Sequence, residues 1–134
     1  MGGIVLLIGR VVFSFFFIYS GFNHLTKLTM FAEYAGASGV PSPTVATAVS
    51  GVMLLAGGLS ILLGVQPRWG ALLLLVFLVP TSFIMHKFWG IADPMMAANQ
   101  AGHFWKNIAL AGASLMIYAL ATLYPARWTY SLGR

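Results

Sequence analysis

Four long apolar runs constrain the fold of this chain more than any other feature of its sequence. The runs cover residues 4–22, 45–65, 69–85 and 108–124, and the spans predicted from them cover about 4–22, 45–65, 69–85 and 103–124. Each run is close to the roughly 20 residues that a helix needs to cross about 30 Å of hydrocarbon. Because backbone groups in lipid must find their hydrogen-bond partners within the protein, these runs are predicted to be membrane-spanning helices. The alternation of polar and apolar residues that is typical of a membrane barrel is absent.

The composition excludes other broad classes of protein. Of the 134 residues, 60% are hydrophobic and only 7% are charged, whereas an average soluble domain is about 25% charged. A chain this short cannot bury so much apolar surface in one soluble core. The seven Lys and Arg residues are scattered singly, so a nucleic-acid partner is not expected. The sequence has no Cys, which excludes disulfides and thiolate metal sites.

We therefore predict an all-α integral membrane protein, a four-helix bundle that forms a single domain over residues 1–134. No repeat or linker divides the chain. A short helix lying in the membrane interface is expected between the first two spans, because apolar residues recur there at three- and four-residue steps. The residues that carry this pattern are Leu25, Leu28, Phe31 and Ala35.

Two helix starts are marked by a polar residue followed by proline. Ser42 precedes Pro43, and Asp93 precedes Pro94. A polar N-cap with proline at the first helical position is typical of a helix N-terminus. The fourth helix is therefore expected to begin near Pro94, outside the membrane, and to continue through Lys106 into the bilayer.

The few polar residues gather toward one side of the predicted membrane. His24 follows the first span, His86 follows the third, and His103 begins the fourth. Polar groups that face the interior of a membrane bundle mark functional sites by default. The residues predicted to bind a quinone or another polar headgroup are His24, His86, Trp89, His103, Lys106 and Asn107.

A simpler interpretation stays open for each of these residues taken alone. Tryptophan is ordinary in the aromatic belts at membrane surfaces, and lysine extends its amine toward the headgroups. Metal binding is not predicted, because no H-x-x-E or H-x-x-x-H spacing occurs, and a haem held by His86 and His103 is the minority alternative. No Cys is present and no Ser lies in a nucleophile elbow, so no catalytic residue is assigned.

Arg10 is the one charge deep inside an apolar run. It lies about 10 Å along the helix from Gly3, at 1.5 Å per residue. One interpretation has its side chain extending back to the nearer membrane surface. The other has Arg10 facing inward and bonded to Ser14 and to a tyrosine of the fourth span such as Tyr118.

Several short motifs resemble, in order, those of the DoxX family of small bacterial four-helix membrane proteins. They cover almost the whole chain. The motifs are Arg10, Gly21-Phe22-Asn23-His24-Leu25, Gly39-Val40-Pro41, Gly57-Gly58 with Leu63-Gly64 and Arg68, His86-Lys87-Phe88-Trp89, and His103-Phe104-Trp105-Lys106-Asn107. The family-like positions among them are Arg10, Gly21, His86, Trp89, Lys106 and Asn107.

The resemblance implies a multi-pass helical bundle in the bacterial inner membrane and an association with redox systems. One branch of the family is a subunit of an archaeal thiosulfate:quinone oxidoreductase, and other members are encoded beside oxidative-stress or biosynthetic proteins. This chain departs from the family pattern at two positions. Many members have Lys where it has His24, and many have an acid where it has Leu54.

Two hypotheses about function remain open, and so does the question of enzymatic activity. The first is a quinone-linked subunit of a redox system, with Phe88, Trp89 and Trp105 as the walls of the quinone site. Its electrons would come from a redox partner protein or another cofactor, because the sequence has no flavin or nicotinamide motif. The second is a non-catalytic membrane scaffold or assembly partner for a peripheral enzyme. A transporter is disfavoured, since four short helices leave little room for inverted repeats.

Membrane lipid is the one partner that the composition requires, and a homo-oligomer is a further hypothesis. Ala56, Ser60 and Gly64 form a stripe of small residues at four-residue spacing. Such stripes let helix backbones approach closely. We favour packing within the bundle as the purpose of this stripe, with a homodimer face as the alternative.

Overall fold

Five α-helices and one short 3₁₀ turn make up the computed structural model, which describes residues 1–128 and 130–132. The elements are α1 (Gly2–Thr26), α2 (Leu28–Ala37), α3 (Pro43–Leu63), α4 (Pro67–Met85), α5 (Pro94–Leu123) and the 3₁₀ turn η1 (Pro125–Arg127). Among these, α1, α3, α4 and α5 are long and apolar enough to cross a membrane. The prediction of an all-α membrane bundle with one additional short helix is confirmed.

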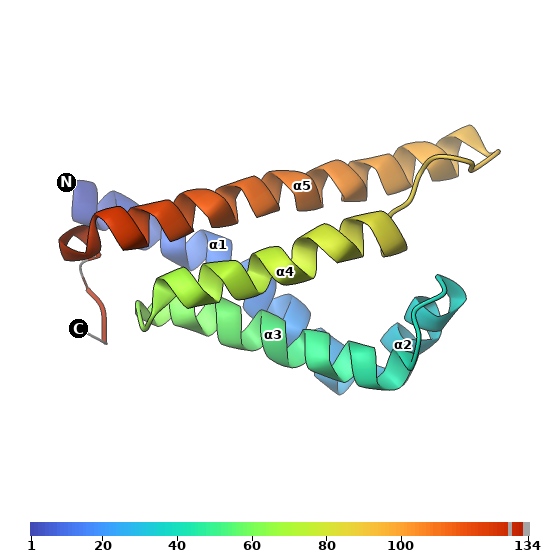
Figure 1. Ribbon diagram of the computed structural model, residues 1–134, viewed down its shortest axis with the longest axis horizontal. Helices are drawn as coiled ribbons and strands as arrows, with labels where there is room; N and C mark the ends of the chain where they lie inside the picture. The colour runs from blue at the N-terminus through green and yellow to red at the C-terminus, as the bar shows by residue number, and fades with distance from the viewer. Residues whose placement is uncertain (129, 133–134) are drawn as a thin grey trace.

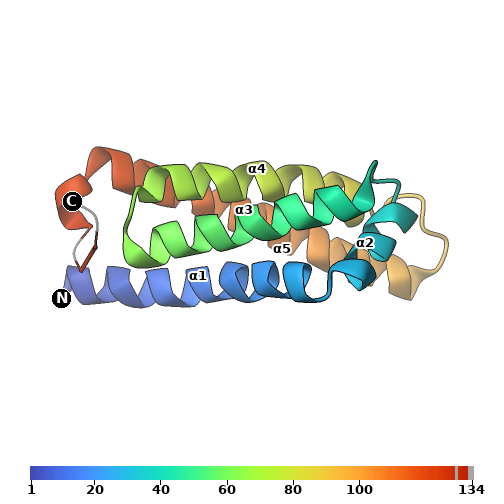
Figure 2. The same cartoon turned by 90° about the horizontal axis from the view of Figure 1, so that it is seen from below.

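The four long helices pack in the order α1, α3, α4, α5. The N-terminus and the 3₁₀ turn η1 lie at one end of the bundle, and α2 and the α4–α5 connection lie at the other (Figures 1 and 2). The short helix α2 packs on the start of α3. The remaining seam lies between α1 and α5, where the Lys106 amine lies 5.1 Å from the centre of the Phe16 ring.

Glycines allow α3 to lie close to the helices on both of its sides. A Cβ atom on Gly21 of α1 would lie 2.8 Å from the carbonyl oxygen of Gly51, and one on Gly57 would lie 3.1 Å from that of Gly70 in α4. Of the predicted small-residue stripe, Ser60 meets Gly70 inside the bundle, whereas Ala56 is exposed. The close packing of α3 therefore depends mainly on glycines outside that stripe.

The core consists of large side chains that interlock behind these close approaches. Phe17 of α1, Leu54 of α3 and Leu74 of α4 are fully buried. Leu54, one of the two positions at which the sequence departs from the pattern it resembles, belongs to the apolar cluster. This part of the bundle therefore offers no buried carboxylate at that position.

Arg10 faces inward and holds the C-terminal end of α3. Its side chain is only 2% exposed. Its Nε donates to the carbonyl oxygen of Ile61 at 3.0 Å, and its Nη2 donates to that of Leu62 at 2.6 Å. The last carbonyls of a helix lack intrahelical donors and carry partial negative charge, so a guanidinium satisfies and stabilises them. The predicted bonds to Ser14 and Tyr118 are not formed, because the guanidinium lies against the last turn of α3.

The marked helix starts are confirmed at Pro43 and Pro94. Asp93 caps α5, with its Oδ1 accepting from the backbone nitrogen of Met95 at 3.2 Å. Ser42 precedes α3 in the left-handed region (φ 46°) and makes no side-chain capping bond. Here the local proline sets the start of the helix without help from the serine hydroxyl.

Candidate functional site

A cavity of about 510 Å³ lies between the helices toward the α2 end, and all five α-helices contribute to its lining. We call it the histidine cavity. Its apolar lining includes three phenylalanine rings, from α1, α2 and α4. Its polar lining consists of Ser20, His24, Tyr34, Thr47, Ser50, Thr81, His86, His103, Lys106 and Asn107.

Five of the six predicted binding residues line this one cavity. They are His24, His86, His103, Lys106 and Asn107. Their convergence follows from helix geometry. His24 is in the last turn of α1, His86 directly follows α4, and the other three lie along one side of α5, at steps of three and four residues.

Trp89, the sixth predicted residue, does not line the cavity, and neither do Phe88 and Trp105. Trp89 packs edge-on against Phe104 at 5.8 Å and contacts Phe83 at 6.2 Å between ring centres. This placement of Trp89 has a local cause. The chain turns after α4, where Gly90 has a φ of +82°, and the turn places Trp89 in an aromatic cluster beside the α4–α5 packing. The rings that line the cavity are instead Phe16, Phe31 and Phe77.

Two of the histidines form a stacked pair. The ring centres of His86 and His103 lie 5.1 Å apart, with 26° between the ring planes. The Nδ1 atom of His86 lies 3.0 Å from Oε1 of Gln100, and Nε2 of Gln100 donates to the Tyr34 hydroxyl at 3.3 Å. This chain of contacts connects the end of α4 to α5 and then to α2.

Gln100 and Tyr34 are site residues that the sequence analysis missed. Gln100 lies three residues before His103, and this spacing places both on the same face of α5. That signal was available. Tyr34 gave none, because its contact with Gln100 joins residues 66 positions apart in the chain.

The bond to Gln100 selects one tautomer of neutral His86. Since an amide oxygen can only accept, Nδ1 of neutral His86 carries the proton and Nε2 keeps its lone pair. Burial lowers the pKa of His86 below its usual 6.5, the bond to Gln100 acts in the opposite direction, and positive charge on His103 and Lys106 lowers the pKa further. The lowered pKa favours the neutral form of His86, in which Nε2 carries no proton.

His24 lies in the same cavity among aromatic rings. Its Nδ1 donates to the carbonyl oxygen of Ser20, one turn earlier in α1, at 2.8 Å. Its ring lies 4.5 Å from that of Phe31 and 6.2 Å from that of Phe77. These contacts hold one histidine edge at the helix end, so His24 contributes a fixed imidazole to the lining.

Lys106 and Asn107 bring two adjacent polar groups from α5. The Lys106 amine lies 3.5 Å from Nδ1 of His103, in addition to its contact with the Phe16 ring. Asn107 is 5% exposed and lines the cavity. Its amide makes no hydrogen bond to any residue in the described part of the chain. Its amide atoms are not among the fully buried polar atoms that lack a partner, so they keep accessible surface, and a ligand or water in the cavity can bond to them.

Pro80 leaves one backbone carbonyl in the cavity wall without its usual helical hydrogen bond. It lies inside α4 and has no N–H, so the Val76 carbonyl loses the donor that an ordinary helix supplies four residues later. Both residues line the histidine cavity. In a membrane such a freed carbonyl has to be satisfied by a neighbouring group or by a cavity-bound molecule.

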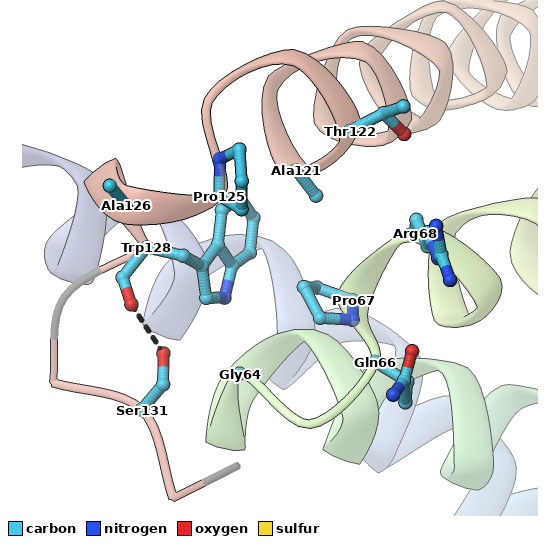
Figure 3. A pocket seen from close by; sticks show the side chains of 10 residues that line it. All are labelled: Gly64, Gln66, Pro67, Arg68, Ala121, Thr122, Pro125, Ala126, Trp128 and Ser131. Carbon is cyan, nitrogen blue, oxygen red and sulfur yellow. Dashed lines mark hydrogen bonds between the residues drawn. The ribbon is translucent and has the colours of Figure 1, made fainter. Parts of the chain in front are cut away.

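A second cavity of about 480 Å³ lies at the opposite end of the bundle (Figure 3). The chain after η1 folds back over the turn between α3 and α4. There the Leu132 nitrogen donates to the carbonyl of Leu63 at 2.9 Å, and the Ser131 hydroxyl donates to the carbonyl of Trp128 at 2.8 Å. The Trp128 indole packs 5.3 Å from the Arg10 guanidinium. These contacts belong to the cap of α3, and no histidine lines this cavity.

No group of three His, Asp or Glu side chains that could hold a metal ion occurs among the described residues.

The histidine cavity combines hydrogen-bond donors, one imidazole whose neutral form has a free lone pair, and apolar walls. Such a site can bind and orient a small ring or headgroup that carries oxygen atoms and is attached to an apolar tail.

The family comparison agrees with this architecture. The model of the DoxX family matches residues 5–87, which covers α1 to α4 and ends one residue after His86. No curated protein and no solved structure matches the chain. The match spans more than half of the sequence and includes three of the four candidate membrane spans. The chain is therefore a multi-pass membrane protein that belongs to the DoxX family.

Proposed function

We propose that this protein is the membrane subunit of a quinone-linked redox system in the bacterial inner membrane, and that the histidine cavity holds the quinone ring. Asn107 is the observation that carries the proposal. The residue is buried in the bundle and lines the cavity, and its amide has no hydrogen-bond partner among the described residues. A quinone presents two carbonyl oxygens, and each needs a hydrogen-bond donor.

The donor set of the cavity fits such a ring. Asn107 can donate from its amide and Lys106 from its amine, while His103 lies beside Lys106. These groups reach the cavity from one helix, so they hold fixed positions relative to one another. Polar side chains are energetically unfavourable in a membrane interior, and they occur there where they bind or orient a ligand.

The apolar lining fits the remainder of the molecule. Phe16, Phe31 and Phe77 present aromatic rings to the cavity from three different helices. Aromatic rings favour offset or edge-on contact with another flat ring. The seam between α1 and α5 lacks the packed interface of the other helix pairs, and we assign it to the apolar tail.

A bound quinone would supply two-electron redox chemistry, and the chain's own residues would bind it, orient it and handle protons. His86 is suited to the last task, because it is neutral with an unprotonated Nε2. Gln100 holds that tautomer in place. The electrons would come from a redox partner protein that docks on the membrane subunit.

The test compares quinone binding by two matched variants in lipid nanodiscs. Asn107→Leu removes the buried amide, and Asn99→Leu removes an exposed amide of α5 that lies outside the cavity. We expect Asn107→Leu to weaken binding of a short-chain quinone about tenfold or more, because it removes a buried hydrogen bond, and to leave the fold intact. Equal affinity of both variants and the wild type would contradict the proposal.

A scaffold for a peripheral enzyme is the second candidate, and the length of α5 favours it. This helix has 30 residues, about 45 Å at 1.5 Å per residue, against about 30 Å of hydrocarbon. Its first turns would extend beyond the bilayer, where Met95 and Met96 are 80% and 60% exposed. Replacing both by Ser should abolish recovery of a partner after gentle solubilisation. Recovery unchanged by this replacement would remove support for the scaffold.

A further inference from the structure

The histidine cavity carries basic side chains without an acidic one. Lys106 and three histidines line it. The chain has only two acidic residues, and neither lines the cavity. Asp93 caps α5, and Glu33 is exposed on α2. Within the described part of the chain, the Lys106 amine therefore has no carboxylate partner.

The contacts of Lys106 compensate its charge only in part. The amine lies 3.5 Å from Nδ1 of His103 and 5.1 Å from the centre of the Phe16 ring. A lone pair and an aromatic face stabilise a cation less than a carboxylate does. Charges in membrane spans pair with one another or mark the path of a charged ligand. Among the residues that the structure describes, Lys106 has no such pair, so a ligand in the cavity is the remaining source of a negative charge.

The position of Lys106 makes it available to a ligand. Its side chain is exposed and also lines the histidine cavity, beside the seam between α1 and α5 and one residue before the buried Asn107. A headgroup that reaches Asn107 from this seam therefore passes the amine. Because the surroundings are less polar than water, one unit of ligand charge here has a larger effect on affinity than it has at a soluble protein surface.

We infer that the histidine cavity selects the ionised form of a ring that carries an acidic hydroxyl over the neutral form of the same ring, and that Lys106 provides this selection. The inference rests on the proposed quinone site and specifies the charge of its ligand. Asn107 binds a ring oxygen in either form. Lys106 can donate to a ring oxygen in either form, and it adds the attraction between opposite charges only when the ring is an anion.

The experiment uses two probes of nearly the same shape. One is a hydroxynaphthoquinone with an alkyl tail, which is ionised at neutral pH, and the other is its neutral methyl ether. Binding of each to the full chain in nanodiscs is measured for the wild type and for Lys106→Met. Partition of the probes into lipid is the same for both proteins, so it cancels in the double comparison.

We expect the wild type to prefer the ionised probe over the methyl ether about tenfold or more relative to Lys106→Met, because loss of the cation weakens binding of the anion more than binding of the neutral ring. Lys87→Met is the matched control, since Lys87 is exposed at the same end of the bundle and does not line the cavity. It should retain the preference. Lys106→Arg keeps the cation and should retain most of the preference for the ionised probe. If Lys106→Met does not fold, this variant still tests whether the positive charge is the cause.

The remaining outcomes separate this inference from the proposed function. Equal preference in the wild type and Lys106→Met overturns the role of Lys106 and leaves a quinone site. Loss of the preference in Lys106→Arg overturns it as well, because charge would then not be the cause. Failure of both probes to bind the wild type overturns the proposed quinone site and this inference together.

Discussion

The side chain of Arg10 in α1 reaches the C-terminal end of α3, where its Nε donates to the Ile61 carbonyl at 3.0 Å. The two residues are 51 positions apart in the chain. The Trp128 indole packs against the same guanidinium at 5.3 Å, so the first helix, the end of α3 and the chain after η1 meet at one charge. In a bundle with little charge, this residue joins three segments.

Replacing Arg10 should destabilise the bundle. Arg10→Met keeps most of the side-chain volume but leaves the Ile61 and Leu62 carbonyls without these donors, and we expect a loss of about 2–3 kcal/mol in the free energy of unfolding. Thermal unfolding in detergent measures the loss. The control is Arg68→Met, which removes an exposed arginine at the same end of the bundle. Similar unfolding temperatures for the two variants would contradict the structural role of Arg10.

A methyl group at Gly21 should separate α1 from α3. The Cβ of Gly21→Ala would lie 2.8 Å from the Gly51 carbonyl oxygen and from the Leu55 nitrogen, which are both backbone atoms that cannot move independently. Overpacking of this kind costs about 1–3 kcal/mol. Gly112→Ala is the matched control, because no atom lies within 4 Å of a Cβ there. If both alanine variants keep wild-type stability, the close approach of α1 and α3 is not as described.

The bridge through Gln100 should hold α2 against the bundle. Gln100→Leu removes the bonds to His86 and to Tyr34, each worth about 0.5–1.5 kcal/mol net. We expect faster hydrogen exchange in α2 and little change in α3, with Asn99→Leu behaving as the wild type. Unchanged exchange in α2 would show that the apolar contacts of this helix suffice to dock it.

His86 should make the protein less stable as the pH falls. Because its pKa in the folded state is lowered below 6.5, the unfolded chain binds more protons in the interval between the two pKa values. Its contribution is therefore complete above about pH 6.5 and is lost as the pH falls through the folded-state pKa.

Unfolding temperatures of the wild type and of His86→Asn measure this effect. Between about pH 8 and about pH 5, the wild type should lose more of its unfolding temperature than the variant, since only the wild type has the His86 proton to bind. His24 and His103 are present in both proteins and serve as the internal control. An equal decline in both proteins would assign the pH dependence to groups other than His86.

The sequence alone was sufficient for the elements of the fold, because these follow from local properties. Run length and hydrophobicity placed the four membrane spans. The prolines at 43 and 94 marked the starts of α3 and α5, and the three- and four-residue spacing of apolar residues predicted α2. The shared position of the three histidines toward one end of the bundle was also predictable, since each lies near the end of a predicted membrane span at that side.

The direction in which each side chain points was decided by the tertiary structure. A soluble helix shows its buried face by its apolar stripe, but a membrane helix is apolar on all sides, because lipid is as apolar as the core. The sequence therefore could not show that Trp89 lies outside the histidine cavity, or that Phe16, Phe31 and Phe77 line it.

Contacts between distant segments were beyond the sequence for the same reason. The partner of Arg10 is a backbone carbonyl of α3, and any residue presents a carbonyl, so the sequence holds no signal for Ile61. The link from His86 through Gln100 to Tyr34 depends on how α2 docks. Local chemistry determined which helices form and where they begin, and the packing of α3 through its glycines decided which polar groups share one cavity.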